Sequence, residues 1–322
     1  MSTSADPGAP WDAIVIGGGA AGLSAALLLG RARRRVLVVD AGSPRNRFAD
    51  HMHGVLGNEG TPPADLLLRG RSEVADYGVE LRDGAVETVR DEGTRLAVTL
   101  ADGGVELARA LVVATGLTDE LPDLPGLAER WGTSVLHCPY CHGWEVRDER
   151  IGILATSPMA LHQARLVRQW SDRVTLLAGA LGPLDPGEEA RLRSRGVEVV
   201  AEPVVEVLGD GPRVTGVRTA DGRVVELDAI FTAGAPRPHD AFLADLRLAR
   251  ADLPFGLGSF LAVDPTGRTS HERVWAVGNV VNPMANVPMA IGAGAFTGGA
   301  VNGALVEEDF DLAGAAREGA GS

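Results

Sequence analysis

The sequence predicts an α/β protein built from two similar domains, the second inserted in the first. A strand, a glycine turn, a helix and a second strand open the chain, and the same order of elements returns 138 residues later. A buried strand near the C-terminus, followed by a helix of small residues, would complete the first domain. We therefore assign residues 1–117 and 237–322 to the first domain and residues 118–236 to the second.

The individual elements follow from apolar runs and the turns between them. In the first copy we expect a strand, a glycine turn, a helix and a strand at 13–16, 17–22, 23–29 and 35–40. In the second copy we expect a strand, a helix and a strand at 150–154, 159–170 and 173–177. Each copy closes on an apolar strand and a small-residue turn, at 111–116 and 229–234. The last strand and helix are expected at 274–278 and 289–306, and the chain from Leu312 on is expected to fray.

The composition indicates a globular protein whose backbone approaches a ligand closely, since 42 of 322 residues are Gly and 45% are apolar. The formal net charge of −13 argues against nucleic acid or an anionic membrane surface as a partner. All 30 basic residues are Arg, which excludes Schiff-base chemistry on Lys. The uncharged stretches 13–30 and 274–306 are interrupted by Gly, Asn or Pro, so we expect no membrane span. The N-terminus lacks the features of a secretory signal, which favours a cytoplasmic protein.

The first turn has the pattern Gly17-x-Gly19-x-x-Gly22 between a strand and a helix, with Asp40 at the end of the next strand. In such a turn the first glycine permits the bend, the second lets a pyrophosphate approach the backbone, and the third lets helix and strand pack. The helix N-terminus then faces the anion, and Asp40 can accept hydrogen bonds from a ribose. This pattern favours a Rossmann-like nucleotide site over a glycine loop that merely packs.

The second copy lacks the groups that would bind such a ligand. Ala155 and Ser157 replace the two anion-facing glycines, Ala160 replaces the third, and Ala178 stands in place of the acidic residue. We expect the Ser157 side chain to cap the following helix, with Pro158 in its first turn. The fold is thus expected to persist without a nicotinamide site, the alternative being a nucleotide held by other contacts.

The two cysteines of the chain lie in the run His137-Cys138-Pro139-Tyr140-Cys141-His142. Two thiols this close can close a disulfide and exchange it with a substrate. The alternative is a zinc site completed by the two histidines, but adjacent residues point apart, so we favour redox use and expect no metal. His142 is a candidate general base, because an unperturbed pKa of about 6.5 suits proton transfer near neutral pH. A solvated loop histidine is the alternative.

Together these motifs resemble the low-molecular-weight thioredoxin reductase family of flavoproteins, over nearly the whole chain. The resemblance rests on the first glycine turn, Asp40, the turn 114–116, the C-x-x-C and Val277-Gly278-Asn279 before the last helix. It implies FAD in the first domain, Cys141 nearest the flavin, Cys138 as the exchanging thiol, and a homodimer. The residues expected to contact FAD are Gly17, Gly19, Ala20, Ala21, Gly22, Asp40, Ala41, Arg45, Asn46, His51, Val86, Ala114, Thr115, Gly116, Gly278, Asn279 and Met289.

Three departures from that family change the expected reaction. His142 and Asn279 stand where the family usually has Asp, and the second domain lacks the glycines and basic run that hold NADPH. With Cys-Pro-Tyr-Cys-His-Gly-Trp-Glu and Pro44-Arg45-Asn46, the pattern is similar to the dithiol oxidases that close disulfides in natural products such as holomycin and gliotoxin. This resemblance implies oxidation of a small-molecule dithiol to its intramolecular disulfide, with O2 as acceptor and H2O2 as product.

Two other functions stay open. The first is a disulfide reductase of a thioredoxin-like protein that takes electrons from a donor such as ferredoxin. The second, from another class, is a flavin-loaded redox sensor without turnover.

Overall fold

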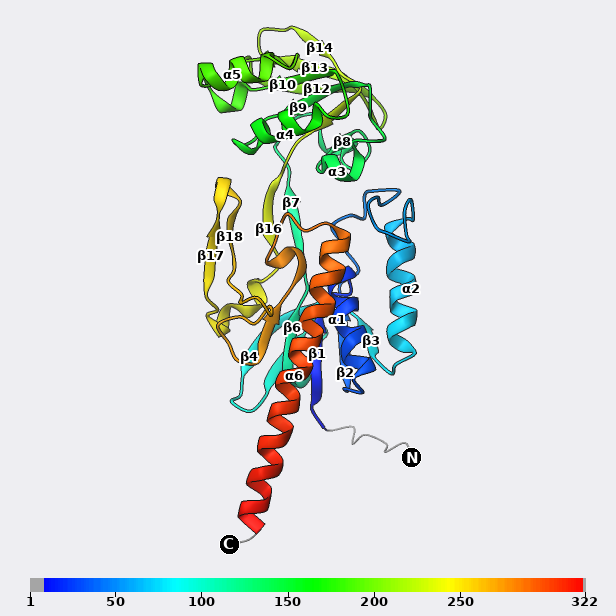
Figure 1. The fold of residues 1–322 in the computed structure, drawn as a ribbon, viewed down its shortest axis with the longest axis vertical. Coiled ribbons are helices and arrows are strands. Elements are labelled where there is room, and N and C mark those ends of the chain that lie inside the picture. Colours follow the sequence, from blue (N-terminus) through cyan, green and yellow to red (C-terminus); the bar gives the residue numbers. More distant parts are fainter. Residues whose placement is uncertain (1–8, 321–322) are drawn as a thin grey trace.

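The computed structural model describes residues 9–320, and Figure 1 shows two α/β bodies joined by a narrow connection. The chain crosses between them in strand β7 (Leu117–Glu120) and returns in strand β16 (Ala235–Pro238). These two strands pair antiparallel, from Leu117 opposite Pro238 to Glu120 opposite Ala235. The domain boundaries predicted at 117/118 and 236/237 fall within this ribbon.

The first body is built on a seven-stranded sheet with the order β3-β2-β1-β6-β5-β4, in which β19 also pairs with β6. The strands β1, β2, β3 and β19 run parallel to their neighbours, and β4 and β5 are antiparallel. Their bounds are β1 Trp11–Ile16, β2 Val36–Asp40, β3 Glu80–Asp83, β4 Val86–Asp91, β5 Leu96–Leu100, β6 Val105–Val113 and β19 Val274–Ala276. Strands β1, β2 and β19 are apolar apart from Asp12 and Asp40, because both of their faces are buried.

Helices α1 (Ala20–Arg31) and α6 (Val287–Ala320) pack together over one face of this sheet (Figure 1). Two glycines of α6 make the close approach possible. A Cβ at Gly298 would lie 2.7 Å from the carbonyl oxygen of Ala25, and one at Gly294 would overlap the Ala21 backbone. Helix α2 (Pro63–Ala75) flanks α1.

Helix α6 is longer than the sequence patterns indicated, because it continues to Ala320 instead of ending at Val306 and fraying from Leu312. The run after Leu312 is rich in alanine, the strongest helix former, and ion pairs anchor the preceding turn. Arg109 contacts both Glu308 and Asp309, at 2.7 and 2.6 Å. By length and apolar composition alone, the stretch Val287–Glu318 could also cross a membrane. Core helices of soluble proteins meet the same two criteria.

The second body holds a five-stranded sheet with the order β11-β10-β9-β15-β8, all pairs parallel. The bounds are β8 Val135–Leu136, β9 Arg150–Leu154, β10 Arg173–Leu177, β11 Glu198–Val200 and β15 Ala229–Phe231. Its helices are α3 Pro139–His142, α4 Met159–Val167 and α5 Pro186–Arg193, so α4 ends three residues before the predicted Trp170. A separate antiparallel sheet is formed by β12 Val204–Asp210, β13 Arg213–Thr219 and β14 Val224–Glu226.

The remaining elements are short. An antiparallel hairpin, β17 Arg250–Leu253 with β18 Gly258–Leu261, extends beside the ribbon (Figure 1). Short 3-10 helices lie at Ala128–Arg130, Gly179–Leu181, Ala241–Leu246, Pro254–Gly256 and Gly278–Val280. The last of these links β19 to the segment before α6 and brings the C-terminal part of the chain to the first glycine turn, where a Cβ at Gly278 would touch the Cβ of Ala21 at 3.0 Å.

Candidate functional site: a glycine turn and a disulfide on one cavity

The first glycine turn is shaped by backbone contacts that tolerate only glycine. Gly17 has φ +105°, and a Cβ there would collide with the carbonyl of Ala114, which directly follows β6. A Cβ at Gly22 would overlap the carbonyl of Gly17, so this residue permits the helix to sit against the strand. At Gly19 the situation differs, because a Cβ would meet no protein atom within 4 Å. The open side of the turn is therefore available to a ligand.

The N-terminus of α1 points its free N–H groups at that open side. Gly19 is the N-cap residue, no side chain caps the helix, and its first turn holds no acidic residue. Uncapped N–H groups and the positive end of the helix dipole together favour an anion. At the end of β2, Asp40 accepts a hydrogen bond from Arg71 at 3.2 Å and lines the same space. These groups fit the pyrophosphate and a ribose of FAD.

One cavity of about 1190 Å³ extends from this turn to the C-x-x-C. Of the predicted site residues, only Gly22 lies outside its lining, since it packs behind the turn. The cavity brings together Gly17, Gly19, Ala20, Ala21, Asp40, Ala41, Arg45, Asn46, His51, Val86, Ala114, Thr115, Gly116, Cys138, Cys141, His142, Gly278, Asn279 and Met289.

The two cysteines are joined in a disulfide, with their Cα atoms 5.2 Å apart. Strand β8 ends at Leu136, Cys138 forms the extended N-cap of the one-turn helix α3, and Pro139 starts that helix. The N–H groups of Cys141 and His142 both donate to the Cys138 carbonyl, at 3.1 and 3.2 Å. The turn therefore holds the two sulfur atoms together at the wall of the cavity, where a substrate thiolate could reach them.

His142 is half-buried directly after the disulfide. Burial lowers the pKa of His142 below its usual 6.5, and the charge of nearby His53 acts in the same direction, while Glu145 opposes it. His53 is itself 2.7 Å from Glu59 and 3.5 Å from Glu145. The lowered pKa leaves the His142 imidazole neutral near pH 7, so it can accept a proton from a thiol.

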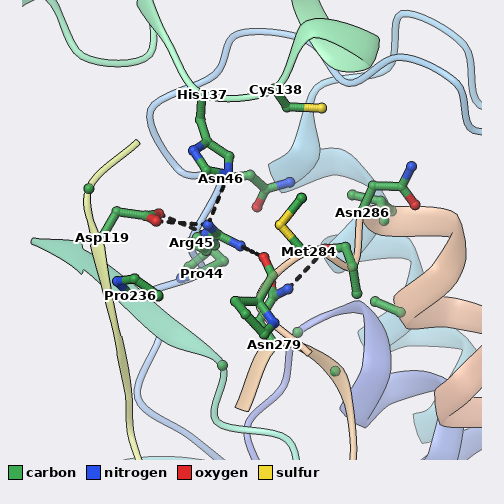
Figure 2. A pocket seen from close by; sticks show the side chains of 18 of the residues that line it. Pro44, Arg45, Asn46, Asp119, His137, Cys138, Pro236, Asn279, Met284 and Asn286 are labelled. Carbon is green, nitrogen blue, oxygen red and sulfur yellow. Dashed lines mark hydrogen bonds and ion pairs between the residues drawn. The ribbon is translucent and has the colours of Figure 1, made fainter. Parts of the chain in front are cut away.

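Arg45 was expected to contact the cofactor, but its guanidinium is occupied by protein groups (Figure 2). Its Nε and Nη2 donate to the two carboxylate oxygens of Asp119, each at 2.7 Å, and its Nη1 donates to the Pro283 carbonyl at 2.7 Å. The same Nη2 lies 3.3 Å from Nε2 of His137. Sequence reasoning missed Asp119 and treated His137 only as a zinc ligand, because no local pattern joins either residue to Arg45.

Asn279, a departure from the family pattern, acts as a donor. Its side-chain Nδ2 donates to the carbonyls of Asn282 and Ala285, each at 2.9 Å, and so holds the loop that carries Pro283 and Met284 (Figure 2). An ionised aspartate in this position could not donate either bond.

The corresponding turn of the second domain is built differently. The Thr156 hydroxyl donates to the Ala233 carbonyl at 2.9 Å. Ala178, where the first domain has its acidic residue, is 1% exposed, and a Cβ on the following Gly179 would lie 2.5 Å from Pro203. The predicted side-chain cap by Ser157 is wrong: α4 has no side-chain cap, and Ser157 accepts from the Ala160 N–H through its backbone carbonyl instead.

Within residues 9–320 no group of three or more His, Cys, Asp or Glu side chains is placed to hold a metal ion. Both cysteines are engaged in the disulfide. The chemistry that this arrangement offers is therefore thiol–disulfide exchange beside an anion-binding turn.

Residues 11–294 match the family described as pyridine nucleotide-disulphide oxidoreductase. A protein named thioredoxin reductase tcpT from Claviceps purpurea is 33% identical over 299 residues, covering 89% of this chain and 92% of that protein. The crystal structure of HlmI matches with a TM-score of 0.91 and 43% identity over 97% of this chain and 98% of that one. An oxidoreductase from Agrobacterium tumefaciens matches with a TM-score of 0.87 and 38% identity over 92% and 99% of the two chains.

The match spans both domains, and the glycine turn, the uncapped helix and the cavity fit the cofactor of that family. The chain therefore belongs to the pyridine nucleotide-disulphide oxidoreductases and is an FAD-dependent oxidoreductase of the thioredoxin reductase type.

Proposed function

We propose that the protein oxidises a small-molecule dithiol to its intramolecular disulfide and passes the electrons to O2, which yields H2O2. The observation that carries the proposal is the second turn, where Ala155 and Ser157 stand in place of the two anion-facing glycines and the buried Ala178 leaves no carboxylate for a nucleotide ribose. Without a nicotinamide donor, electrons enter through the disulfide. The direction of flow is then from dithiol to cofactor.

The cysteine pair performs two exchange steps in this proposal. A substrate thiolate attacks Sγ of Cys138, the Cys138–Cys141 bond breaks, and Cys141 leaves as a thiolate. The second substrate thiol, deprotonated by neutral His142, then attacks the substrate sulfur of the mixed disulfide and releases Cys138. The product is the intramolecular disulfide, and the two electrons stay on the cysteine pair as two thiolates, while His142 holds the proton of the second substrate thiol. Bound FAD supplies a two-electron acceptor that a dithiol can reduce and O2 can reoxidise.

The test is anaerobic mixing of the holoenzyme with dithiothreitol, followed by admission of air. We expect the flavin absorbance to bleach, and peroxide to appear in stoichiometric amount once oxygen enters. A holoenzyme that does not bleach with dithiols would contradict the proposal. Bleaching by reduced ferredoxin, with electrons delivered to a thioredoxin-like disulfide, would favour the reductase alternative, and bleaching without repeated turnover would favour a sensor.

We further propose that the enzyme is a homodimer, as its resemblance to the family implies. Apolar side chains are exposed on the end of α6 that extends beyond the sheet in Figure 1, with Phe310 73% and Leu312 61% exposed. A contact with a second chain would cover these side chains and add apolar area to the interface. Light scattering of the purified holoenzyme measures the mass directly, and a mass near 33.5 kDa would contradict the dimer.

A further inference from the structure

Arg45 links parts of the chain that are distant in sequence, and Figure 2 shows them meeting at its guanidinium. Arg45 lies in the loop after β2, Asp119 in the connecting ribbon, Pro283 before α6, and His137 directly before Cys138. All three guanidinium nitrogens of Arg45 take part: the contacts to Asp119 and Pro283 measure 2.7 Å, and the contact to His137 measures 3.3 Å. No other single side chain type could serve them, because only Arg offers a planar fork of five donors.

The ion pair between Arg45 and Asp119 is mostly shielded from water, with 19% and 8% of the two side chains exposed. A bidentate pair in such surroundings specifies one geometry, and removal of one partner leaves an uncompensated buried charge. Burial and, after it, the charge of Arg45 lower the pKa of His137, so that this imidazole is neutral and can accept from the guanidinium at Nε2.

These contacts cross between the two bodies. Arg45 and Pro283 belong to the first body, whereas β8 places His137 on the edge of the second sheet. The covalent connection is the two-stranded ribbon alone, and a ribbon of four paired residues does not by itself fix the angle between two domains. Noncovalent contacts must set that angle.

The loop that carries Arg45 also touches the second body through its backbone. Gly132 has φ +84°, and a Cβ there would lie 2.6 Å from the Cβ of Phe48 and 2.8 Å from its carbonyl oxygen. Residues 45–48 therefore dock against residues 132–137 at two independent points, one ionic and one steric.

We propose that Arg45 is a positioning residue that fixes the orientation of the C-x-x-C domain relative to the cofactor cavity. It does so through its contacts with Asp119 of the ribbon and with His137 beside Cys138, which we call the clamp. The proposal rests on the proposed function, in which electrons pass from the cysteine pair to the cofactor. The clamp controls this transfer and leaves both cofactor binding and the reaction with O2 to other residues.

The test compares Arg45→Met with the matched control Arg237→Met. Arg237 forms an ion pair with Glu120 on the same ribbon, at 2.7 Å, but both side chains are largely exposed and neither reaches His137. For Arg45→Met we expect a normal FAD content, at least about a tenfold fall in the anaerobic bleaching rate at saturating dithiothreitol, and an unchanged rate of oxygen reoxidation after photoreduction. For Arg237→Met we expect all three values to match the unmodified enzyme.

A fall in the bleaching rate with an unchanged reoxidation rate indicates a positioning role. A general loss of structure would lower both rates. Equal bleaching rates in Arg45→Met and the unmodified enzyme would overturn the clamp while leaving the proposed function intact, whereas an unmodified enzyme that dithiothreitol does not bleach contradicts the proposed function itself. Loss of FAD from Arg45→Met would also overturn the clamp, because it would make Arg45 a cofactor ligand.

A second variant disturbs the same docking without touching a charge. Gly132→Ala pushes the loop away at Phe48, so we expect slower bleaching, unchanged reoxidation, and a wider particle in small-angle X-ray scattering. If Arg45→Met does not fold, Gly132→Ala tests the proposal alone. A normal bleaching rate in Gly132→Ala, together with a wider particle in small-angle X-ray scattering, would overturn the proposal.

Discussion

The Thr156 hydroxyl donates to the carbonyl of Ala233 at 2.9 Å and so joins the end of β9 to the end of β15. In the first domain the corresponding turn is open, and a Cβ at Gly19 would meet no protein atom. The two turns hold equivalent positions in their domains, but only the first keeps its open glycine at position 19 and an acidic residue, Asp40, beside it. The second domain therefore offers a nucleotide fewer binding groups than the first.

Nicotinamide nucleotides should not reduce this flavin at a useful rate. The second domain offers neither open glycines nor a charged partner for the ribose, and each missing charge-assisted hydrogen bond is worth about 1.5 to 3 kcal/mol. Stopped-flow absorbance with millimolar NADPH or NADH under anaerobic conditions measures the rate. Rapid bleaching by either nucleotide would contradict the prediction and restore a conventional reductase.

Gly19→Val should yield protein without bound flavin. A valine there displaces no protein atom, so the fold is expected to persist, but its side chain occupies the space where the pyrophosphate approaches the helix N-terminus. Gly299→Val on the exposed side of α6, where a Cβ also meets nothing, is the matched control and should stay yellow. The ratio of flavin to protein absorbance reports the result, and a fully loaded Gly19→Val would show that the assignment is wrong.

The two cysteines should differ in their spectroscopic behaviour. If Cys141 faces the flavin, Cys138→Ser leaves its thiolate free to give a long-wavelength charge-transfer band with oxidised FAD, whereas Cys141→Ser has no thiolate in that position. Both variants should lose turnover, because neither can re-form the disulfide. A band seen only in Cys141→Ser would reverse the roles of the pair.

The bleaching rate should fall on the acid side of neutrality because of His142. Burial lowers the pKa of His142 below 6.5, so the imidazole is neutral at pH 7 and becomes unable to accept a proton only as the pH falls through that lowered pKa. His142→Gln should lower the rate at pH 7 by about a hundredfold and remove this acid limb.

The control for His142 is His271→Gln, since His271 lies outside the cavity, 3.3 Å from Asp91. Stopped-flow bleaching with dithiothreitol between about pH 5 and pH 8 gives the pH profile of each variant. This pH range includes the ordinary histidine pKa of about 6.5. An acid limb that persists unchanged in His142→Gln would assign the base to another group.

Much of the fold followed from local patterns. The glycine spacing 17–19–22, the alternation of apolar strands with helices and the repeat at 138 residues predicted two α/β domains, because strand, turn and helix preferences act over a few residues. Element ends were less well predicted. Helix α4 ends at Val167 and α6 runs on to Ala320, since the end of a helix depends on packing and on ion pairs such as Arg109 with Glu308.

The sequence by itself determined the chemistry that this protein carries: an anion-binding glycine turn, a pair of cysteines three residues apart, and a second turn without the groups for a nucleotide. Only the tertiary structure decided how these parts meet. The contacts of Arg45 with Asp119 and His137 join residues separated by 74 and 92 positions, and the Thr156 hydroxyl donates to a carbonyl 77 positions away. Such contacts have no local signal, because they form where folding brings the ends of separate strands to one edge of a sheet.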